Sequence, residues 1–365
     1  MQKLDWYILR KLLVTFVFCM LLFTVIAVAV DISEKTDDFV KANLTASEIF
    51  YKYYIGFIPH ILCLLYPLFV FIAVIYFTSK MATQSEIIAI LSSGTSYNRF
   101  LRPYLVGGVL LGLVLFLANR FVIPKANIIR GNFQTQYLDA ADPSKNMYYG
   151  SCATCFYLRT DSNTFVGIKN YDTASHTATG FFLDRTKKDK LVYNIRSQSI
   201  SWDTALKKWK LYHVTERYVD SIGERLKDHD TLVLDLGLQP FELRRDDYLK
   251  DKLTTPELVR YIHKEELRGT EGLSALQVER YRRTASAFSV ILLTLIGAVI
   301  ASKKTRGGSG MHLALGIIIA SLFMFSDRFS TVFATKSSFP PFLAAWLPNI
   351  VFGIVAYRMY RNTPK

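Results

Sequence analysis

The chain has 365 residues, of which 51% are apolar, and its mean hydropathy of +0.20 exceeds that of an ordinary soluble protein of this length. This composition argues against a purely soluble protein and favours membrane spans. The net charge of +14 is compatible with nucleic acid. Residues 124–280, however, are nearly balanced, and the excess lies around the apolar segments. Membrane topology and anionic lipid explain that distribution better, so we expect no nucleic-acid partner.

Six apolar segments have a length suited to crossing a membrane. A spanning helix needs about 20 residues, and the candidate windows are 12–30, 55–78, 104–118, 285–301, 312–326 and 342–357. The third and fifth windows are short, so each must extend into its polar flanks. The first is too long for a cleaved signal peptide, and no small-residue cleavage site follows it. We therefore expect it to be retained as a span.

The distribution of charge predicts the orientation. Segments 1–11, 79–103, 302–311 and 358–365 are rich in Lys and Arg, with Asp5 and Glu86 as their only acids. The loop at 31–54 instead holds more acids than bases. Because basic loops stay on the cytoplasmic side, both termini are predicted to be cytoplasmic.

The segment between the second and third windows, 85–102, contains an amphipathic helix. Ser85 precedes Glu86 as a candidate cap, and Ile87, Ile90 and Leu91 form an apolar stripe before the Ser-Ser-Gly-Thr break. Taken alone, the pattern is compatible with a helix lying on the lipid surface.

After the third window the pattern changes to strands. Residues 190–202 alternate with a period of two, and 208–220 follow a turn-like segment, which predicts a hairpin. Residues 164–172, 180–185 and 231–238 are further strand candidates. Many strands without intervening helices indicate an all-β domain, as a sandwich, jelly roll or open barrel.

Two helices are predicted to connect this β domain to the fourth window. Thr255-Pro256-Glu257 begins the first, with Thr255 as its cap, and Ser274–Gln277 form a capping box that begins the second. The predicted organisation is three spans (1–123), a periplasmic β domain (124–254), connecting helices (255–284) and three spans (285–365).

The motifs of common catalytic sites are missing from the sequence. It has no G-x-x-x-x-G-K-[ST] phosphate loop, no G-x-S-x-G elbow and no H-E-x-x-H pair. Cys152 and Cys155 form a C-x-x-C, for which a local disulfide, two free thiols, a redox pair or half a metal site are open. No second pair supports a metal site, so we expect no bound metal and no cofactor in this chain.

Ionisable residues are concentrated at the outer ends of the spans instead of at mid-depth. Lys35 follows the first window, Arg120 the third and Arg328 the fifth. They either anchor the spans at the interface or pair with the phosphates of an anionic lipid whose acyl chains lie against apolar walls. The lack of charged pairs at mid-depth argues against an ion-coupled secondary transporter.

Several stretches together resemble a known family. "SEIIAILSSGTS" lies between the second and third windows, "VIPKAN" closes the third, "RGGSGMHLALGI" lies between the fourth and fifth, and "PPFLAAWLPNIVF" opens the sixth. With the three-plus-three layout around a β domain, the whole chain resembles the lipopolysaccharide export permeases of the LptF/LptG type. The "KKTRGG" loop is slightly more similar to LptG-like chains. We expect the glycines at 306–310 to form a tight cytoplasmic turn.

The resemblance implies a fold and a function. It implies six transmembrane helices with an inserted, jelly-roll-like periplasmic domain, in the inner membrane of a Gram-negative bacterium. Such a chain is a non-catalytic permease subunit that pairs with a second homologous chain on a cytoplasmic ABC ATPase dimer, which binds the ATP and Mg²⁺. It extracts lipopolysaccharide from the outer leaflet and passes it to periplasmic jelly-roll bridge proteins.

The resemblance also implies site residues. The 85–102 segment corresponds to a coupling helix seated in the ATPase, with Glu86 as a polar contact. The full coupling set is Ser85, Glu86, Ile87, Ile90, Leu91, Gly94 and Arg99. For the lipid phosphates, Lys35 and Arg130 match basic positions of the family, although Gln134 stands where a second base is expected. The set for phosphate contact is Lys35, Arg120, Arg130 and Arg328.

A different class of function remains open. A membrane scaffold or sensor would also carry an external β domain that binds a ligand. It would not need a structured, partly apolar helix and a glycine-rich loop on the cytoplasmic side.

Overall fold

The computed structural model describes residues 3–138, 156–172, 175–188, 190–220, 223–238, 240, 248–268, 272–303, 308–337 and 339–362. The chain divides into a helical unit (Met1–Tyr137, Lys250–Leu258 and Ser274–Lys365) and a unit that contains the strands (Leu138–Leu249 and Val259–Leu273). Cys152 and Cys155 lie outside the described residues, so the interpretation of the C-x-x-C motif stays a prediction.

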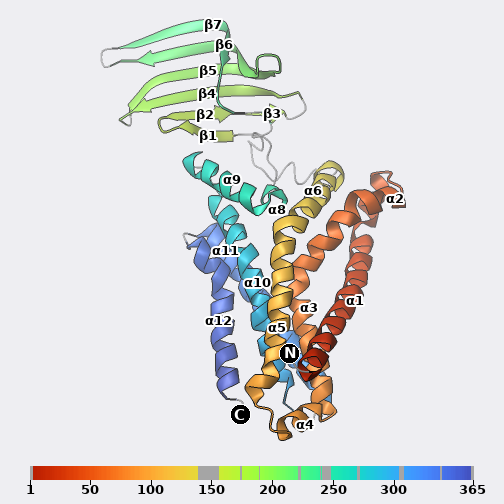
Figure 1. Ribbon diagram of the computed structural model, residues 1–365. Helices are drawn as coiled ribbons and strands as arrows, with labels where there is room; N and C mark the ends of the chain where they lie inside the picture. Colours follow the sequence, from red (N-terminus) through yellow and green to blue (C-terminus); the bar gives the residue numbers. More distant parts are fainter. Residues whose placement is uncertain are drawn as a thin grey trace. The chain divides into compact units, whose positions relative to one another are not determined.

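The first half of the helical unit is nearly continuous helix (Figure 1). Its elements are α1 (Lys3–Lys41), α2 (Ala46–Ile49), the π-helix η1 (Phe50–Tyr54), α3 (Ile55–Thr83), α4 (Glu86–Ser92), α5 (Tyr97–Leu117), the π-helix η2 (Ala118–Val122), α6 (Ile123–Phe133) and the π-helix η3 (Gln134–Leu138). The helices after the strands are α8 (Leu249–Lys252), α9 (Thr255–Arg268), α10 (Leu273–Ala301), α11 (Gly308–Lys336) and α12 (Pro341–Arg361).

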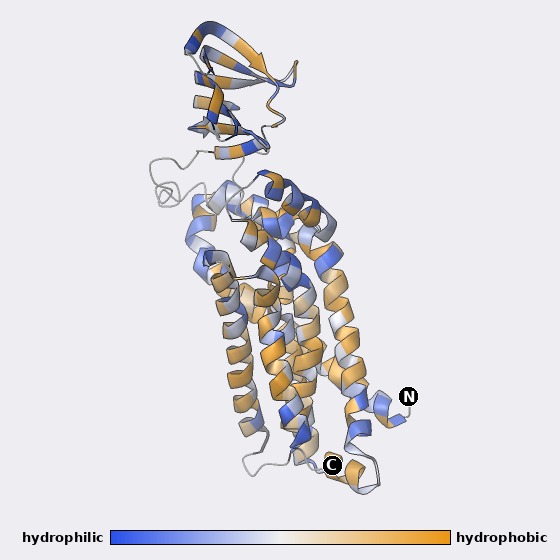
Figure 2. Ribbon diagram, turned by 90° about the vertical axis from the view of Figure 1, so that its left-hand side faces the viewer, coloured by the Kyte–Doolittle hydropathy of each residue, from blue (hydrophilic) through white to orange (hydrophobic). Residues whose placement is uncertain are grey.

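Six helical stretches within the described ranges are long and apolar enough to cross a membrane, as predicted. Figure 2 shows the apolar length of the bundle between polar helix ends. Both chain termini and α4 lie at one end of the bundle (Figure 1). We call this the inner end, and the end that carries α2, α6 and α8 the outer end.

Two predicted boundaries are wrong. The β domain does not begin at residue 124, because the third span continues through η2 and α6 to Leu138. Pro124 lies in the first turn of α6, directly after the π-helical turn η2. The predicted turn at 306–310 is wrong for residues 308–310, which begin α11; residues 306 and 307 lie outside the described ranges.

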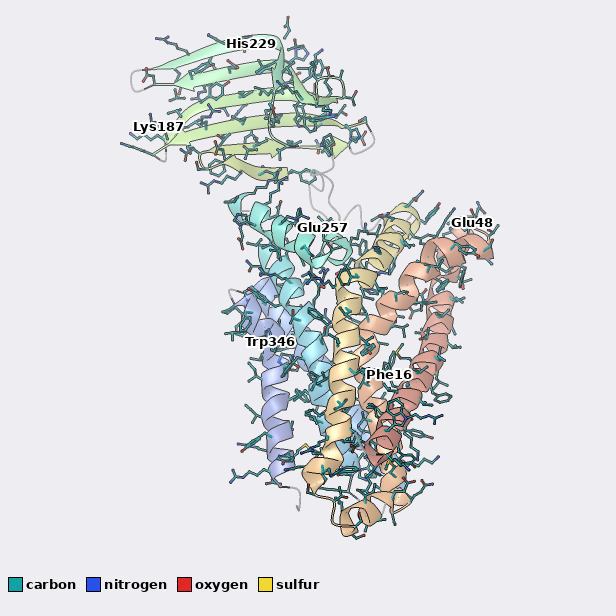
Figure 3. All side chains as sticks on the ribbon, viewed as in Figure 1. Phe16, Glu48, Lys187, His229, Glu257 and Trp346 are labelled. Atoms are coloured by element: carbon teal, nitrogen blue, oxygen red, sulfur yellow. The ribbon has the colours of Figure 1, made fainter. Side chains whose placement is uncertain are left out.

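Close helix packing holds the bundle together. One apolar core joins α1, α3, α4 and α5, and it includes Phe16, labelled on α1 in Figure 3. A second core joins α3, α10, α11 and α12. At Gly112 of α5 an added Cβ would lie 2.8 Å from the carbonyl oxygen of Ala287 on α10. Small residues at such crossings allow membrane helices to approach closely.

The strands form the predicted inserted β domain. They are β1 (Phe156–Asp161), β2 (Thr164–Ile168), β3 (Tyr171–Asp172), β4 (Thr177–Lys187), β5 (Lys190–Asp203), β6 (Lys208–Val219) and β7 (Glu224–Leu234). All pairs are antiparallel, in the order β1-β2-β4-β5-β6-β7, with β3 also paired to β4. The neighbours in the sheet thus follow the order of the sequence.

The predicted hairpin is confirmed as β5 and β6. The side chain of Asp203 accepts hydrogen bonds from the backbone N–H groups of Ala205 and Leu206, which closes the turn. Trp209 is fully buried on one face of the sheet and donates its indole N–H to the carbonyl of Leu238 at 2.8 Å. The sheet therefore has its own core.

The predicted cap of α9 is displaced by one residue. The carboxylate of Glu257 accepts hydrogen bonds from both the backbone N–H and the hydroxyl of Thr254, at 2.9 and 2.6 Å. The carbonyl of Thr254 accepts the first helical hydrogen bond, from Leu258. Thr254, not Thr255, is therefore the N-cap, and Pro256 occupies the second helical position.

Candidate functional site

The four cations predicted to contact lipid phosphate fall into two groups. Lys35 belongs to the first, because its ammonium lies 2.6 Å from a carboxylate oxygen of buried Asp31. Tyr53 and Tyr54 also donate to that carboxylate, each at 3.1 Å, and Lys35 lies over the ring of Tyr53. Lys35 therefore balances an internal charge and ties α1 to η1.

Arg130 also contacts other side chains of the same protein. Its guanidinium lies 3.9 Å from a carboxylate oxygen of Asp251 on α8, and it donates to the side chain of Gln134 at 3.3 Å. Gln134, which departs from the expected family pattern, thus acts as a partner of Arg130. Arg130 is thus partly occupied by internal partners, and its contact with lipid phosphate stays a prediction.

Arg120 and Arg328 form the second group. Both are exposed, and Arg120 lies over the ring of Phe121 with 5.7 Å between the guanidinium carbon and the ring centroid. Neither makes an ion pair with any residue that the structure describes. These two cations are therefore available to a ligand.

A polar cavity of about 140 Å³ lies at the outer end of the bundle. Side chains of α3, η2, α6, α8, α10 and α11 line it, and Arg328 of α11 is one of them. Its apolar wall includes Leu64, Leu68, Leu293, Phe323 and Met324, and its polar wall includes His60, Asn119, Asn127, Asp251, Glu279, Arg282, Arg283 and Asp327. Ionisable side chains inside a bundle of spans are costly, so this lining makes the cavity a candidate functional region.

Most charges around this polar cavity are paired. Arg282 on α10 lies 3.1 Å from Asp327 on α11, and Arg283 lies 3.1 Å from Glu279 one turn earlier on α10. Burying an unpaired charge costs roughly several kcal/mol of desolvation free energy. Ion pairing offsets part of this cost, so these charged side chains can lie inside the bundle. The Arg282–Asp327 pair cannot be recognised in the sequence, because its two partners belong to different spans.

Arg283 fastens the segment that leads out of the β domain. Its guanidinium donates to the backbone carbonyls of Lys250 and Leu253, both at 2.9 Å, besides its bond to Glu279. These carbonyls end α8, where helical carbonyls have no partner of their own. Arg283 thereby joins α8 to the first turns of the fourth span.

A chain of neutral groups continues from the same segment. The side-chain N–H of Asn127 donates to the backbone carbonyl of Asp251 at 2.9 Å, and its oxygen lies 2.8 Å from Nδ1 of His60. This links α8 to α6 and α3. A displacement of α8 would therefore act on three spans through α3, α6 and α10.

The predicted coupling segment is shorter than expected. Only Glu86–Ser92 form α4, while Arg99 already belongs to α5, where it is half-buried. Ser85 has the left-handed backbone conformation (φ 60°), and its side chain makes no capping bond. Gly94 (φ 85°) ends α4 as expected of a C-terminal glycine, with its N–H bonded to the carbonyl of Leu91.

Glu86 contacts the first span. Its carboxylate accepts a hydrogen bond from the hydroxyl of Tyr7 at 3.2 Å and lies 3.8 Å from the ammonium of Lys11. The contact ties the beginning of α4 to α1. About a third of the side chain stays exposed, so one side of the carboxylate can still meet a partner.

The predicted apolar anchor of α4 faces inward. Ile87 is 2% exposed within the core of α1, α3 and α5, and Ile90 and Leu91 pack against the same core. The expectation that the side chain of Ile87 fills a groove in another protein is therefore wrong, whereas a contact through half-buried Ile90 and Leu91 stays a prediction. The exposed face of α4 instead carries Ile88, which is 51% exposed, with Ala89 and Ser92.

These features define a class: a six-span membrane protein with an inserted antiparallel β domain and a short helix exposed at its inner end. The family model of the lipopolysaccharide export system permease LptF/LptG matches residues 6–362. The chain belongs to this family of non-catalytic permease subunits of the inner membrane. A comparison with individually curated proteins found no match. No group of His, Cys, Asp and Glu suited to a metal ion occurs in the described ranges.

Proposed function

We propose that this chain is a transmembrane subunit of an ATP-driven exporter that extracts lipopolysaccharide from the outer leaflet of the inner membrane. The observation that carries the proposal is the family match along residues 6–362 of a chain with six spans and an inserted β domain. The inner end carries both termini and faces the cytoplasm, in keeping with its basic flanks.

The energy for transport comes from another polypeptide. The lack of a phosphate loop in the sequence agrees with binding of ATP and Mg²⁺ by a cytoplasmic ABC ATPase dimer, the arrangement that the family implies. That ATPase contacts the exposed face of α4 around Ile88, next to the free side of Glu86. Because Ile87 is packed in the core of α1, α3 and α5, movement of α4 is transmitted to those spans.

Lipid recognition takes place at the outer end. Arg120 and Arg328 pair with phosphate groups, for which a guanidinium is well suited by its planar set of donors. A second homologous permease chain completes the path, and the β domain passes the lipid to periplasmic bridge proteins. The network from Arg283 to His60 couples the segment after the strands to the spans.

The proposal is tested by crosslinking in cells. A photoreactive amino acid replaces Arg328 or Arg120, and replacement of exposed Trp6 at the inner end serves as the matched control. We expect lipopolysaccharide adducts at Arg328 and Arg120, but not at Trp6, and a change in adduct yield when the ATPase is inactivated. No lipopolysaccharide adduct at either outer position would contradict the proposal.

The alternative of a scaffold or sensor gives a different result. Adducts that do not respond to inactivation of the ATPase would indicate that lipid binds without being transported. The exposed apolar face of α4 at the inner end favours the exporter, because a scaffold has no need of such a contact.

A further inference from the structure

A second concave surface lies at the inner end, far along the bundle from the polar cavity. It is a groove of about 380 Å³ between α5, α10 and α12. Leu101 and Leu105 of α5, and Leu295 and Val299 of α10, form its apolar wall. Asn98, Arg102, Ala356, Tyr357 and Tyr360 complete it. We refer to it as the inner groove.

Helix packing explains where the inner groove ends. At Gly108 of α5, one turn beyond Leu105, an added Cβ would lie 3.2 Å from Thr294 on α10. This close approach closes the groove towards the outer end. At the other end, Tyr360 donates its hydroxyl to the side chain of Asn98, which joins α12 to α5. These two contacts bound the groove at both ends.

One cation lies at the mouth of the inner groove. Arg102 is exposed and makes no ion pair within the described part of the chain. The surrounding ends of α5 and α12 add Arg99, Arg358 and Arg361. The nearby acid Glu86 is already bonded to Tyr7 and lies close to Lys11. The region therefore has a positive potential and attracts anionic groups.

We propose that the inner groove binds one anionic phospholipid of the membrane leaflet at the inner end. Its phosphate pairs with the guanidinium of Arg102, and an acyl chain lies against Leu105, Leu295 and Val299. The hydroxyl groups of Tyr357 and Tyr360 lie near the headgroup, as tyrosines do at membrane interfaces.

Charge and shape favour this occupant over a partner helix. A basic pocket between spans on the cytoplasmic side is a known arrangement for anionic lipid headgroups. A packed helix would bury the guanidinium of Arg102 and would have to supply an acid for it. The assigned leaflet depends on the proposed orientation, whereas binding itself does not depend on lipopolysaccharide export.

The test uses the full-length chain, purified from membranes with its associated chains and examined by native mass spectrometry. Phosphatidylglycerol and phosphatidylcholine of equal chain length are titrated in parallel. We expect a single high-affinity phosphatidylglycerol. Arg102→Gln should weaken its binding about tenfold, as expected for the loss of a charge-assisted pair. Arg10→Gln removes an exposed cation of α1 at the same end, away from the groove wall, and should have little effect.

A second variant tests the apolar wall. Leu105 is 46% exposed, so Leu105→Trp should fold while filling the inner groove, and bound phosphatidylglycerol should be lost without any change of charge. Equal binding of the two lipids, or equal loss in Arg102→Gln and Arg10→Gln, would overturn the proposal. A photoreactive group at Leu105 that captures a protein instead of phospholipid would overturn it as well.

Discussion

Individual charged residues in this protein are used mainly to fasten its helices. Lys35 binds Asp31, Arg130 lies near Asp251 and Arg282 binds Asp327. A charge inside a membrane bundle is costly, and pairing is the usual solution. The predicted phosphate contacts rest on charge, on position at the outer ends of the spans and, for Lys35 and Arg130, on the family resemblance. The structure separates these four cations into two groups. Lys35 and Arg130 have internal acidic partners, whereas Arg120 and Arg328 make no ion pair with a described residue.

The role of Arg283 gives a prediction at this scale. Arg283→Met keeps the length of the side chain but leaves the Glu279 carboxylate and the carbonyls of Lys250 and Leu253 without this donor. Breaking a buried pair in this way costs about 3 kcal/mol or more. We expect a lower melting temperature and faster proteolysis near residues 248–258.

Arg280→Met is the matched control, because Arg280 lies over the ring of Tyr281 and makes no ion pair with a described residue. The double variant Arg283→Met with Glu279→Gln should recover part of the lost stability, since it also removes the unpaired carboxylate. If Arg283→Met and Arg280→Met were equally stable, Arg283 would not hold this segment.

At the scale of elements, α4 has two faces with separate roles. Its inner face, with Ile87, belongs to the core, while its outer face, with Ile88, is open. The sequence predicted the helix and its apolar stripe correctly. It could not determine which isoleucine faces the chain's own core, since a helix of seven residues with several apolar positions can be turned either way.

Substitutions on the two faces of α4 should therefore behave differently. Ile88→Asp should release the ATPase during co-purification while leaving stability within about 0.5 kcal/mol. Ile87→Ala should lower stability by about 2 kcal/mol or more, through the cavity that it leaves. Asn362→Asp adds a charge at an exposed position beyond the end of α12 and serves as the control. Unchanged co-purification in Ile88→Asp would contradict the assignment of this face.

Two variants together test whether the carboxylate of Glu86 contacts the ATPase. Glu86→Lys would place a second cation beside Lys11, so loss of the ATPase in that variant could come from the missing carboxylate or from repulsion of Lys11. Tyr7→Phe removes the internal hydrogen bond and keeps the carboxylate. Retention of the ATPase in Tyr7→Phe and its loss in Glu86→Gln would assign the contact to the carboxylate itself.

At the scale of the whole molecule, the spans and the strands are separate units with separate cores. Each unit should therefore keep its structure without the other. A short flexible linker in place of residues 156–234 should leave a chain that inserts six spans and retains the ATPase. Lipopolysaccharide should then accumulate in the inner membrane, because the route to the periplasmic bridge is lost.

Membrane extraction and co-purification measure the first part of this prediction, and fractionation of lipopolysaccharide between the two membranes measures the second. A variant that keeps the strands but carries a linker of equal length in place of residues 139–155 is the control. Normal lipopolysaccharide transport without the strands would show that the β domain is dispensable.

The sequence alone determined the six spans, the inserted β domain, the β5–β6 hairpin and the position of the helix at the inner end. These features depend on local periodicity, segment length and turn residues, all of which can be read within about twenty residues of one another. The length of the third span was underestimated because polar residues after Ala118 continue the helix through π turns.

Only the tertiary structure decided which charges are paired, which face of α4 is open and where the cavities lie. Tyr7 meets Glu86, Arg130 approaches Asp251, and Arg282 meets Asp327, although long stretches of chain separate the partners. Hydropathy and residue spacing do not predict such contacts, because the contacts arise from the packing of one span against another. For the same reason the inner groove exists only once Gly108 has brought α5 against α10.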